Sequence, residues 1–212
     1  DDAVSFWRNQ LEDAKKATYP PTAKASSSKG DKVTRLMRNR IEFPSTNTSV
    51  TKATIIRAAW AIVLARYCDT DDVTFGTTVS GRHAPVPNLG EMPGPMVATV
   101  PVRVRLDQEQ RISTYLNRIQ AQASDMIAYE QFGMQHIAKI TPEAQEACDF
   151  SSLLVIQPFS PLAAMNSDGE TVLEPSGDAG PDDEKMEGYF NYPLVIQASV
   201  SDTEVSLHMT YD

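Results

Sequence analysis

The sequence contains few of the residues from which metal centres, disulfides and membrane spans are built. Its two cysteines, Cys68 and Cys148, lie eighty positions apart and outside any CxxC pattern, so two reduced, buried thiols are favoured over a metal site or a disulfide. No apolar run exceeds about a dozen residues, which is too short to cross a hydrocarbon layer of about 30 Å. The acidic, amphipathic N-terminus has no signal-peptide pattern. These absences predict a cytoplasmic globular domain without a metal ion.

Catalytic signatures are also missing. There is no GxSxG elbow, no P-loop and no Gly-rich dinucleotide turn. The three histidines are His83 in a loop, His136 on a short helix and His208 on the final strand. His208 and Asp212 have the HxxxD spacing, but four strand positions span about 13 Å, too far for the carboxylate to orient the imidazole. We therefore predict that His208 is a polar residue on the exposed face of an edge strand, and that the chain has no self-sufficient active site.

Charge of one sign is concentrated in two segments. The net charge is −9, which argues against a nucleic-acid partner. Residues 158–188 hold eight acidic residues and one lysine, whereas residues 15–40 hold eight basic residues and one aspartate. These segments are interpreted as solvated loops, or as segments that attract each other or partners of opposite charge within about 10 Å.

The chain does contain the pattern of one α/β domain. Its 212 residues, 41% of them hydrophobic, suffice for one sizeable core. Residues 49–68 are apolar nearly all round, which predicts a core helix with Ser49 or Thr51 as its N-cap. Helices are also predicted at 4–16, 108–127 (with Ile112, Ile119 and Met126 on its apolar face) and 132–140 (ended by Thr141-Pro142), and strands at 33–43, 73–79, 100–104, 150–157, 193–200 and 203–212. This order predicts a two-layer α/β domain with a mixed sheet.

The most informative stretch is FGTTVSGRHAPVPNLGEMPGPMVATVPVRV, from Phe75 to Val104, in which a long loop joins two predicted strands. The loop is rich in residues with special backbone preferences: Gly81, Gly90, Gly94, Pro85, Pro87, Pro93 and Pro95. Glycine permits positive φ and proline fixes φ near −65°, so the path of the loop is constrained although it lacks regular structure. Such a loop suits a rigid surface that lines a cleft; the alternative is a long loop closed on its own side chains.

This stretch resembles the condensation domains of nonribosomal peptide synthetases in their fungal form. Four further segments resemble the same family in the same order: AVSFWRNQL at 3–11, TKATIIRAAWAIVLARY at 51–67, IAYEQFGMQHI at 127–137 with Glu130 and Gln131, and CDFSSLLVIQP at 148–158. The similarity covers essentially the whole chain. GPMVATV at 94–100 stands where the family usually has GxFVNT, a variation associated with fungal enzymes.

The resemblance implies a fold like that of chloramphenicol acetyltransferase, in which two lobes form a V and carrier-borne substrates enter the tunnel between them. Residues 1–212 would be a single C-terminal lobe, with a floor-loop segment at 80–98 and an acidic latch at 158–190. The implied partners are the N-terminal lobe and carrier (thiolation) domains, whose phosphopantetheine bears the substrates; no cofactor binds this chain directly. The implied tunnel and floor-loop residues are Ser80, Gly81, Arg82, Gly94, Pro95, Met96, Ser151, Ser152 and Gln157. The alternative is that these residues only hold strand ends and turns.

One departure from the family is decisive for the activity. The family's active-site motif, HHxxxDG or the SHxxxD of terminal cyclising variants, belongs to the N-terminal lobe and does not occur in this sequence. The resemblance therefore implies half of an enzyme that forms amide bonds, or that cyclises and releases a peptide, and an isolated chain that is inactive. The alternatives are a non-catalytic module that docks carrier domains and an epimerisation domain of the same fold.

Overall fold

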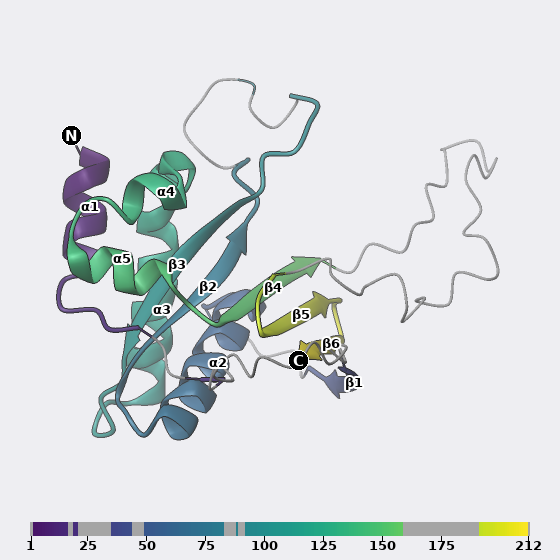
Figure 1. The fold of residues 1–212 in the computed structure, drawn as a ribbon. Coiled ribbons are helices and arrows are strands. Elements are labelled where there is room, and N and C mark those ends of the chain that lie inside the picture. Colours follow the sequence, from purple (N-terminus) through teal and green to yellow (C-terminus); the bar gives the residue numbers. More distant parts are fainter. Residues whose placement is uncertain are drawn as a thin grey trace, which may run out of the picture.

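The computed structural model describes residues 2–16, 19–20, 35–43, 49–82, 88, 92–158 and 191–211. Within these ranges, six strands form one mixed sheet accompanied by helices (Figure 1), so the predicted mixed α/β class is confirmed. The helices are α1 (Asp2–Gln10), α2 (Lys52–Cys68), α3 (Ile112–Met126), the 3₁₀ helix η2 (Ile127–Phe132), α4 (Met134–Ile137) and α5 (Pro142–Cys148). The strands are β1 (Arg35–Glu42), β2 (Asp72–Val79), β3 (Ala98–Arg105), β4 (Ser152–Pro158), β5 (Leu194–Val200) and β6 (Glu204–Tyr211).

The strand order in the sheet is β1-β6-β5-β4-β2-β3. β4 runs parallel to β2 and to β5, and the remaining neighbours are antiparallel. β1 pairs with β6 over its whole length, from Arg35 opposite Tyr211 to Glu42 opposite Glu204. The prediction that His208 lies on an edge strand is therefore wrong: β6 is an inner strand. Pairing between strands so far apart in sequence leaves no local pattern from which it could have been predicted.

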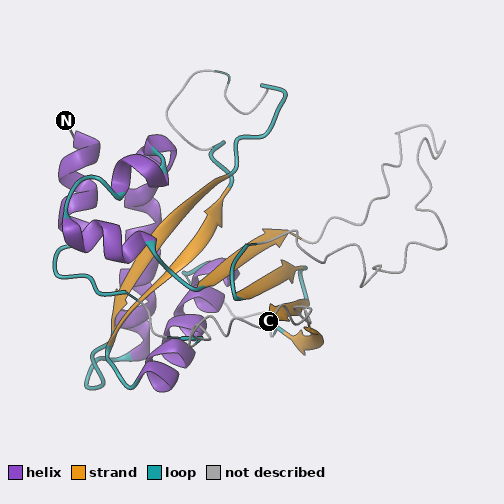
Figure 2. Ribbon diagram, viewed as in Figure 1, coloured by secondary structure: helices purple, strands orange, loops and turns teal. Residues whose placement is uncertain are grey.

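The sheet has two halves that diverge. β2 pairs with β4 at Gly76–Leu153 and Thr77–Leu154 alone among the described residues, whereas β4 pairs with β5 from end to end. Beyond this short contact the β2–β3 hairpin and the β4–β5 strands point in different directions (Figure 2). The hairpin loop, residues 80–97, leaves the sheet after the last hairpin pair, Val79 opposite Ala98.

α2 is apolar on nearly all sides, as predicted, but it is buried on only one of them. The Thr51 side chain accepts a hydrogen bond from the Thr54 backbone N–H, as an N-cap should. Small side chains including Ala58 and Ala61 face the interior, which lets the helix approach the sheet closely. Tyr67 on the opposite side is 66% exposed, with Ile62 and Val63 also exposed. The apolar residues thus exceed what the core covers, and the expectation of a fully buried helix is corrected.

Two other helical predictions need correction. Ile112, expected on the apolar face of α3, is 75% exposed; the buried side chains of α3 are those of Tyr115, Ile119 and Met126. Thr141-Pro142 begins a helix as well as following one: Thr141 caps α5 by accepting from the Ala144 N–H, and Pro142 stands at the first helical position, where no N–H is needed. α5 was therefore missed from the sequence.

The core lies between the sheet and the helices. Its largest fully buried side chains include those of Trp7, Leu11, Leu64, Phe75 and Ile137. Both cysteines are free, half-buried thiols. In the described part of the chain no helix is long and apolar enough to cross a membrane, and no group of acidic, histidine or cysteine side chains is arranged to hold a metal ion.

Candidate functional site

Side chains, rather than strand pairing, hold the base of the hairpin loop. The Arg82 guanidinium donates from Nη1 to the Met92 carbonyl oxygen at 2.9 Å and from Nη2 to the Gly94 carbonyl oxygen at 2.8 Å. The Arg82 N–H also faces the Ser80 hydroxyl at 3.4 Å. Arg82 therefore ties the outgoing stem of the loop to the returning stem.

Gly81 lies where the outgoing stem passes closest to its neighbours. Its φ of 68° is in the left-handed region, and a Cβ atom there would lie 1.9 Å from Gln131 Nε2 and 2.1 Å from the Met96 carbonyl oxygen. The Gln131 amide fills this space and donates to the Met96 oxygen at 2.7 Å. Both the backbone conformation and the space at this position thus require glycine.

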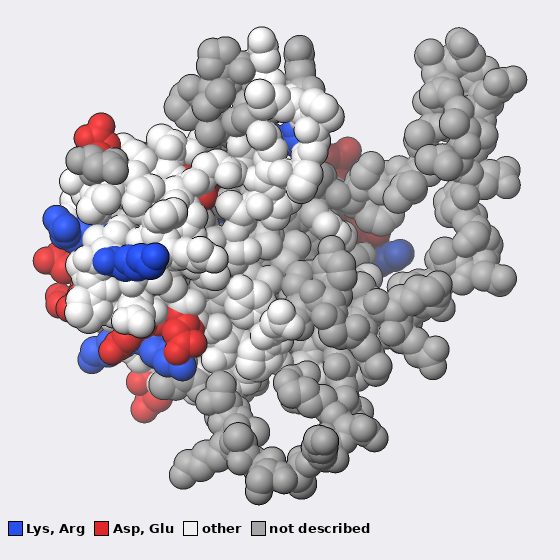
Figure 3. Space-filling model, turned by 45° about the horizontal axis from the view of Figure 1, so that its top comes forward, with Lys and Arg blue, Asp and Glu red and all other residues white. Residues whose placement is uncertain are grey.

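The returning stem of the loop, residues 92–97, is largely exposed. Gly94 has a φ of 124°, and apart from its two chain neighbours no described residue has an atom within 4 Å of a Cβ placed there. Pro95 is exposed, Met96 is half-buried, and Val97 is 68% exposed. Seen from the loop side, much of the described surface is free of charged side chains; most of those in view lie on the left, and a few lie near the top and beside the grey segments on the right (Figure 3). The described part of the returning stem, residues 92–97, therefore carries only uncharged side chains.

The three site residues predicted on β4 lie apart from the loop cluster. Ser151 and Ser152 are buried, with 5% and 0% exposure, and the Ser151 carbonyl accepts from the Leu194 N–H. The Ser152 hydroxyl has no hydrogen-bond partner among the residues that the structure describes. Gln157, at the other end of β4, is exposed and donates to the Ser199 hydroxyl at 3.4 Å. The structure therefore brings Ser80, Gly81, Arg82, Gly94 and Met96 together and separates the two buried serines from them.

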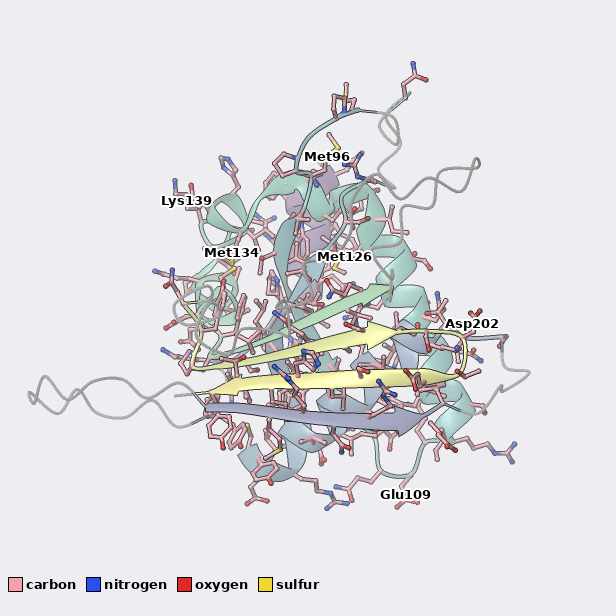
Figure 4. All side chains as sticks on the ribbon, turned by 90° about the vertical axis from the view of Figure 1, so that its right-hand side faces the viewer. Met96, Glu109, Met126, Met134, Lys139 and Asp202 are labelled. Atoms are coloured by element: carbon pink, nitrogen blue, oxygen red, sulfur yellow. The ribbon has the colours of Figure 1, made fainter. Side chains whose placement is uncertain are left out.

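Two rows of polar side chains cross the sheet on the same face as the Gln157 side chain. The register places Ser199 and Ser206 beside Gln157, and His208 between Gln197 and Arg38. This polar sheet face is made of Gln157, Gln197, Ser199, Ser206, His208, Arg38 and Arg40. In Figure 4 the strands β5, β6 and β1 lie in front of the described helices. The opposite face of β6 packs on the core through Leu207, Met209 and Tyr211.

The histidines do not form a catalytic pair in the described structure. Burial lowers the pKa of His208, and the positive charge of Arg38 lowers it further, so both effects favour the neutral imidazole. Within the described residues, neither His208 nor His136 forms an ion pair with a carboxylate. His136 is exposed beside the Phe132 ring, and His83 lies outside the described residues. No general base oriented by an acid follows from this arrangement.

A hollow of about 320 Å³ lies between α1 and α3 and involves none of the predicted site residues. Its walls include Arg103, Arg105 and Arg118, which would suit an anion if they were unpaired. Asp72, however, pairs with Arg103 and approaches Arg105, and Asp125 lies in the same wall as Arg118. The positive charge is therefore locally balanced, and the hollow is not assigned to a ligand.

Fold and sequence comparisons assign the class of this domain. The condensation domain family profile matches residues 1–212, and the chain belongs to this family. The chain is 36% identical over 212 residues to the nonribosomal peptide synthetase dtxS1 of Metarhizium robertsii, covering 99% of this chain and 2% of that protein. It is 44% identical over 154 residues to nonribosomal peptide synthetase 30 of Fusarium vanettenii, covering 72% and 3%.

A solved structure confirms the fold. The starter condensation domain of the rhizomide synthetase RzmA, in a mutant form with C8-CoA and Leu-SNAC, superposes with a TM-score of 0.66 at 11% identity. The superposition covers 99% of this chain and 46% of that one. The chain thus has the fold found in condensation domains and spans less than half of that solved chain, and a few per cent of the curated relatives it matches.

Proposed function

We propose that this chain is the C-terminal lobe of a condensation domain, and that the intact domain joins two carrier-borne substrates through an amide bond. Membership of the condensation family supports this proposal. The single observation that supports a role for this lobe is the hairpin loop, which projects beyond the sheet on stems fixed by Arg82 and Gln131. In this proposal segment 80–98 is the floor of the substrate tunnel and segment 158–190 is a latch; residues 159–190 lie outside the described structure.

The proposed reaction needs one nucleophilic attack. The amine nitrogen of the acceptor attacks the thioester carbonyl carbon of the donor, the C–N bond forms, and the C–S bond breaks. The proton lost by the amine is passed to the phosphopantetheine thiolate of the donor carrier, which leaves as a thiol. We assign the base to the N-terminal lobe. This lobe contributes by position, because holding two reactants in one geometry removes most of the entropic cost of their encounter.

The site residues take two roles in this proposal. Ser80, Gly81, Arg82, Gly94, Pro95 and Met96 shape the floor loop. The amide of Gln157 on β4 is exposed and could exchange its hydrogen bond with Ser199 for one with a substrate or the other lobe. The buried Ser151, which precedes β4, and Ser152 act through the position of the strand. None of these side chains is a catalytic acid or base, so the isolated lobe is expected to be inactive.

Mixing two separately expressed lobes tests this proposal. Acyl transfer from a carrier-loaded donor to an amine-loaded carrier is measured for this chain alone, for the N-terminal lobe of the parent alone, and for both together. Activity only on mixing is the expected result. Arg82→Gln should then reduce the activity of the mixture, and Arg111→Gln, an equal loss of charge at the exposed N-cap of α3, should not. Turnover by this chain alone would contradict the proposal.

Two finer variants give different products in the same assay. A terminal domain would release a cyclic peptide, and an epimerisation domain would invert a residue on one carrier without forming an amide bond. A lobe that only docks carrier domains would bind them and leave both substrates unchanged. The histidine placement favours this last alternative for the isolated chain, since no described histidine is paired with an acid.

A further inference from the structure

Gln131 joins the hairpin loop to a part of the domain outside the hairpin. It belongs to η2, the short 3₁₀ helix between α3 and α4. In Figure 4, Met96 of the loop lies above Met126 and Met134, the residues that precede and follow η2 and its closing glycine. The Gln131 side chain reaches the Met96 carbonyl in one stem of the loop and covers Gly81 in the other.

η2 itself is anchored on its other side by α1. The Trp7 indole N–H donates to the Tyr129 carbonyl oxygen at 3.2 Å, and the Phe6 ring stacks on the Tyr129 ring at 4.5 Å between centroids. Trp7 is 1% exposed, and Glu130, next to Gln131, is 4% exposed. The backbone that carries Gln131 is therefore fixed by packing from both α1 and the core, which makes it a suitable reference point for the loop.

Arg82 and Gln131 do different things for the loop. Arg82 bonds two carbonyl groups within the loop. These two hydrogen bonds hold the stems to each other and would survive a pivot of the loop about the last hairpin pair. Gln131 is bonded to the loop from η2, so it opposes that pivoting.

We infer that Gln131 is a positioning residue that fixes the hairpin loop against η2, and that its amide occupies the space that the lack of a Cβ at Gly81 leaves. The family resemblance points to the motif IAYEQFGMQHI at 127–137 but implies no role for Gln131. The inferred role is to position the loop. The catalytic consequence rests on the proposed function: if the loop closes the tunnel, the pivot angle that Gln131 sets decides how much room the acceptor has.

Hydrogen exchange on the full chain tests the inference without any assay of activity. Gln131→Glu keeps the shape of the side chain but replaces the N–H donor by an acceptor that faces the Met96 carbonyl. Backbone amides at 79–82 and 96–98 should exchange about 3- to 10-fold faster, which corresponds to the loss of one ordinary hydrogen bond. Amides of β5 and β6 should be unchanged. Gln135→Glu, the same substitution on an exposed residue of α4, is the matched control and should exchange like the wild type.

A second variant and a kinetic measurement separate the two claims. Gln131→Met removes the donor without adding charge and should give the same local increase if Gln131→Glu is too unstable to study. Unchanged exchange at the loop, or an equal change in Gln135→Glu, would overturn the positioning role. In the reconstituted enzyme, the KM for the amine acceptor should rise 3- to 10-fold with kcat within about twofold. Faster exchange with unaltered kinetics would uphold the positioning role and overturn the proposed function of the loop as tunnel floor.

Discussion

Arg103 of β3 and Asp72 of β2 form a bidentate ion pair at the end of the hairpin that lies away from its loop. Arg103 Nε donates to Asp72 Oδ1 at 2.8 Å, and Nη2 donates to Oδ2. The same guanidinium donates to the backbone carbonyls of Glu12 and Asp13, so it also fixes the turn after α1 against the sheet. Because the Arg103 side chain is only 5% exposed, its charge depends on these partners.

Removing the carboxylate should therefore destabilise the domain. Asp72→Asn leaves a buried guanidinium with fewer compensating charges, and we expect the free energy of unfolding in urea to fall by about 2–3 kcal/mol. Glu204→Gln is the control, because its partner Arg40 lies 3.6 Å away with its side chain 73% exposed, and such pairs contribute below about 1 kcal/mol. Equal losses in the two variants would contradict the importance of burial here.

The Phe150 ring occupies the side-chain space of Gly76. A Cβ atom at Gly76 would lie 2.1 Å from the ring, and both residues are buried, so Gly76→Ala should lower the free energy of unfolding by about 1–3 kcal/mol through overpacking. Phe150→Leu replaces the ring by a smaller side chain, so in this background Gly76→Ala should lower the free energy of unfolding by less. A double-mutant cycle measures this coupling; additive losses would show that the two positions do not compete for space.

His208 should make the domain less stable in mild acid. Its folded-state pKa lies below the ordinary value of 6.5 because of burial and the nearby Arg38 charge, so the unfolded chain binds more protons between the two pKa values. The stabilising contribution is complete above about pH 6.5 and is lost as the pH falls through the folded-state pKa. NMR titration should show the pKa of His208 rising in Arg38→Gln. Urea unfolding of His208→Gln should show a weaker dependence on pH in this range, and an unaltered dependence would refute the assignment.

Cys148 should be a poor nucleophile in the folded state. Burial raises the pKa of its thiol to about 11, and its Sγ lies 3.8 Å from the Met134 carbonyl oxygen. At pH 8 the thiolate fraction is then about 100-fold smaller than for a thiol with a pKa of 9. In a Cys68→Ser background, alkylation by iodoacetamide should be slower by about this factor in native protein than in urea. The native rate should still be rising above pH 10; a plateau near pH 9 would contradict the expectation.

Much of the fold could be predicted because its signals are local. Thr51, the apolar run that follows it, and the alternation of Val205, Leu207, Met209 and Tyr211 each act within a few residues, and the structure places these four side chains of β6 toward the core. The pairing of β1 with β6 and the selection of Ala58 and Ala61 as the buried side of α2 depend on distant partners. Neither feature has a local signal in the sequence, so the apolar run at 49–68 predicts a core helix and does not reveal that one side of α2 is exposed.

The candidate site was predictable in part for the same reason. Gly81 and Gly94 could be singled out by their backbone freedom, and both have positive φ. Gln131 could not, because its role depends on a carbonyl group 35 positions earlier in the chain. Thr141-Pro142 shows a different limit: the same dipeptide satisfies the rules for ending one helix and for starting the next, and only the Ala144 N–H decides between them.

The two halves of the sheet are paired to each other only through the short contact between β2 and β4 in the described part of the chain. Within each half the strands pair over most of their length. Between the halves, the described residues pair only at Gly76–Leu153 and Thr77–Leu154. A rotation of one half relative to the other about these two pairs would change the distance between the hairpin loop and Gln157, and it would leave the strand pairing within each half intact. The Phe150 ring lies against Gly76 at the same place, and the Thr77 hydroxyl donates there to the Leu154 carbonyl oxygen at 3.0 Å. A larger side chain at position 76 would therefore act directly on the contact between the two halves.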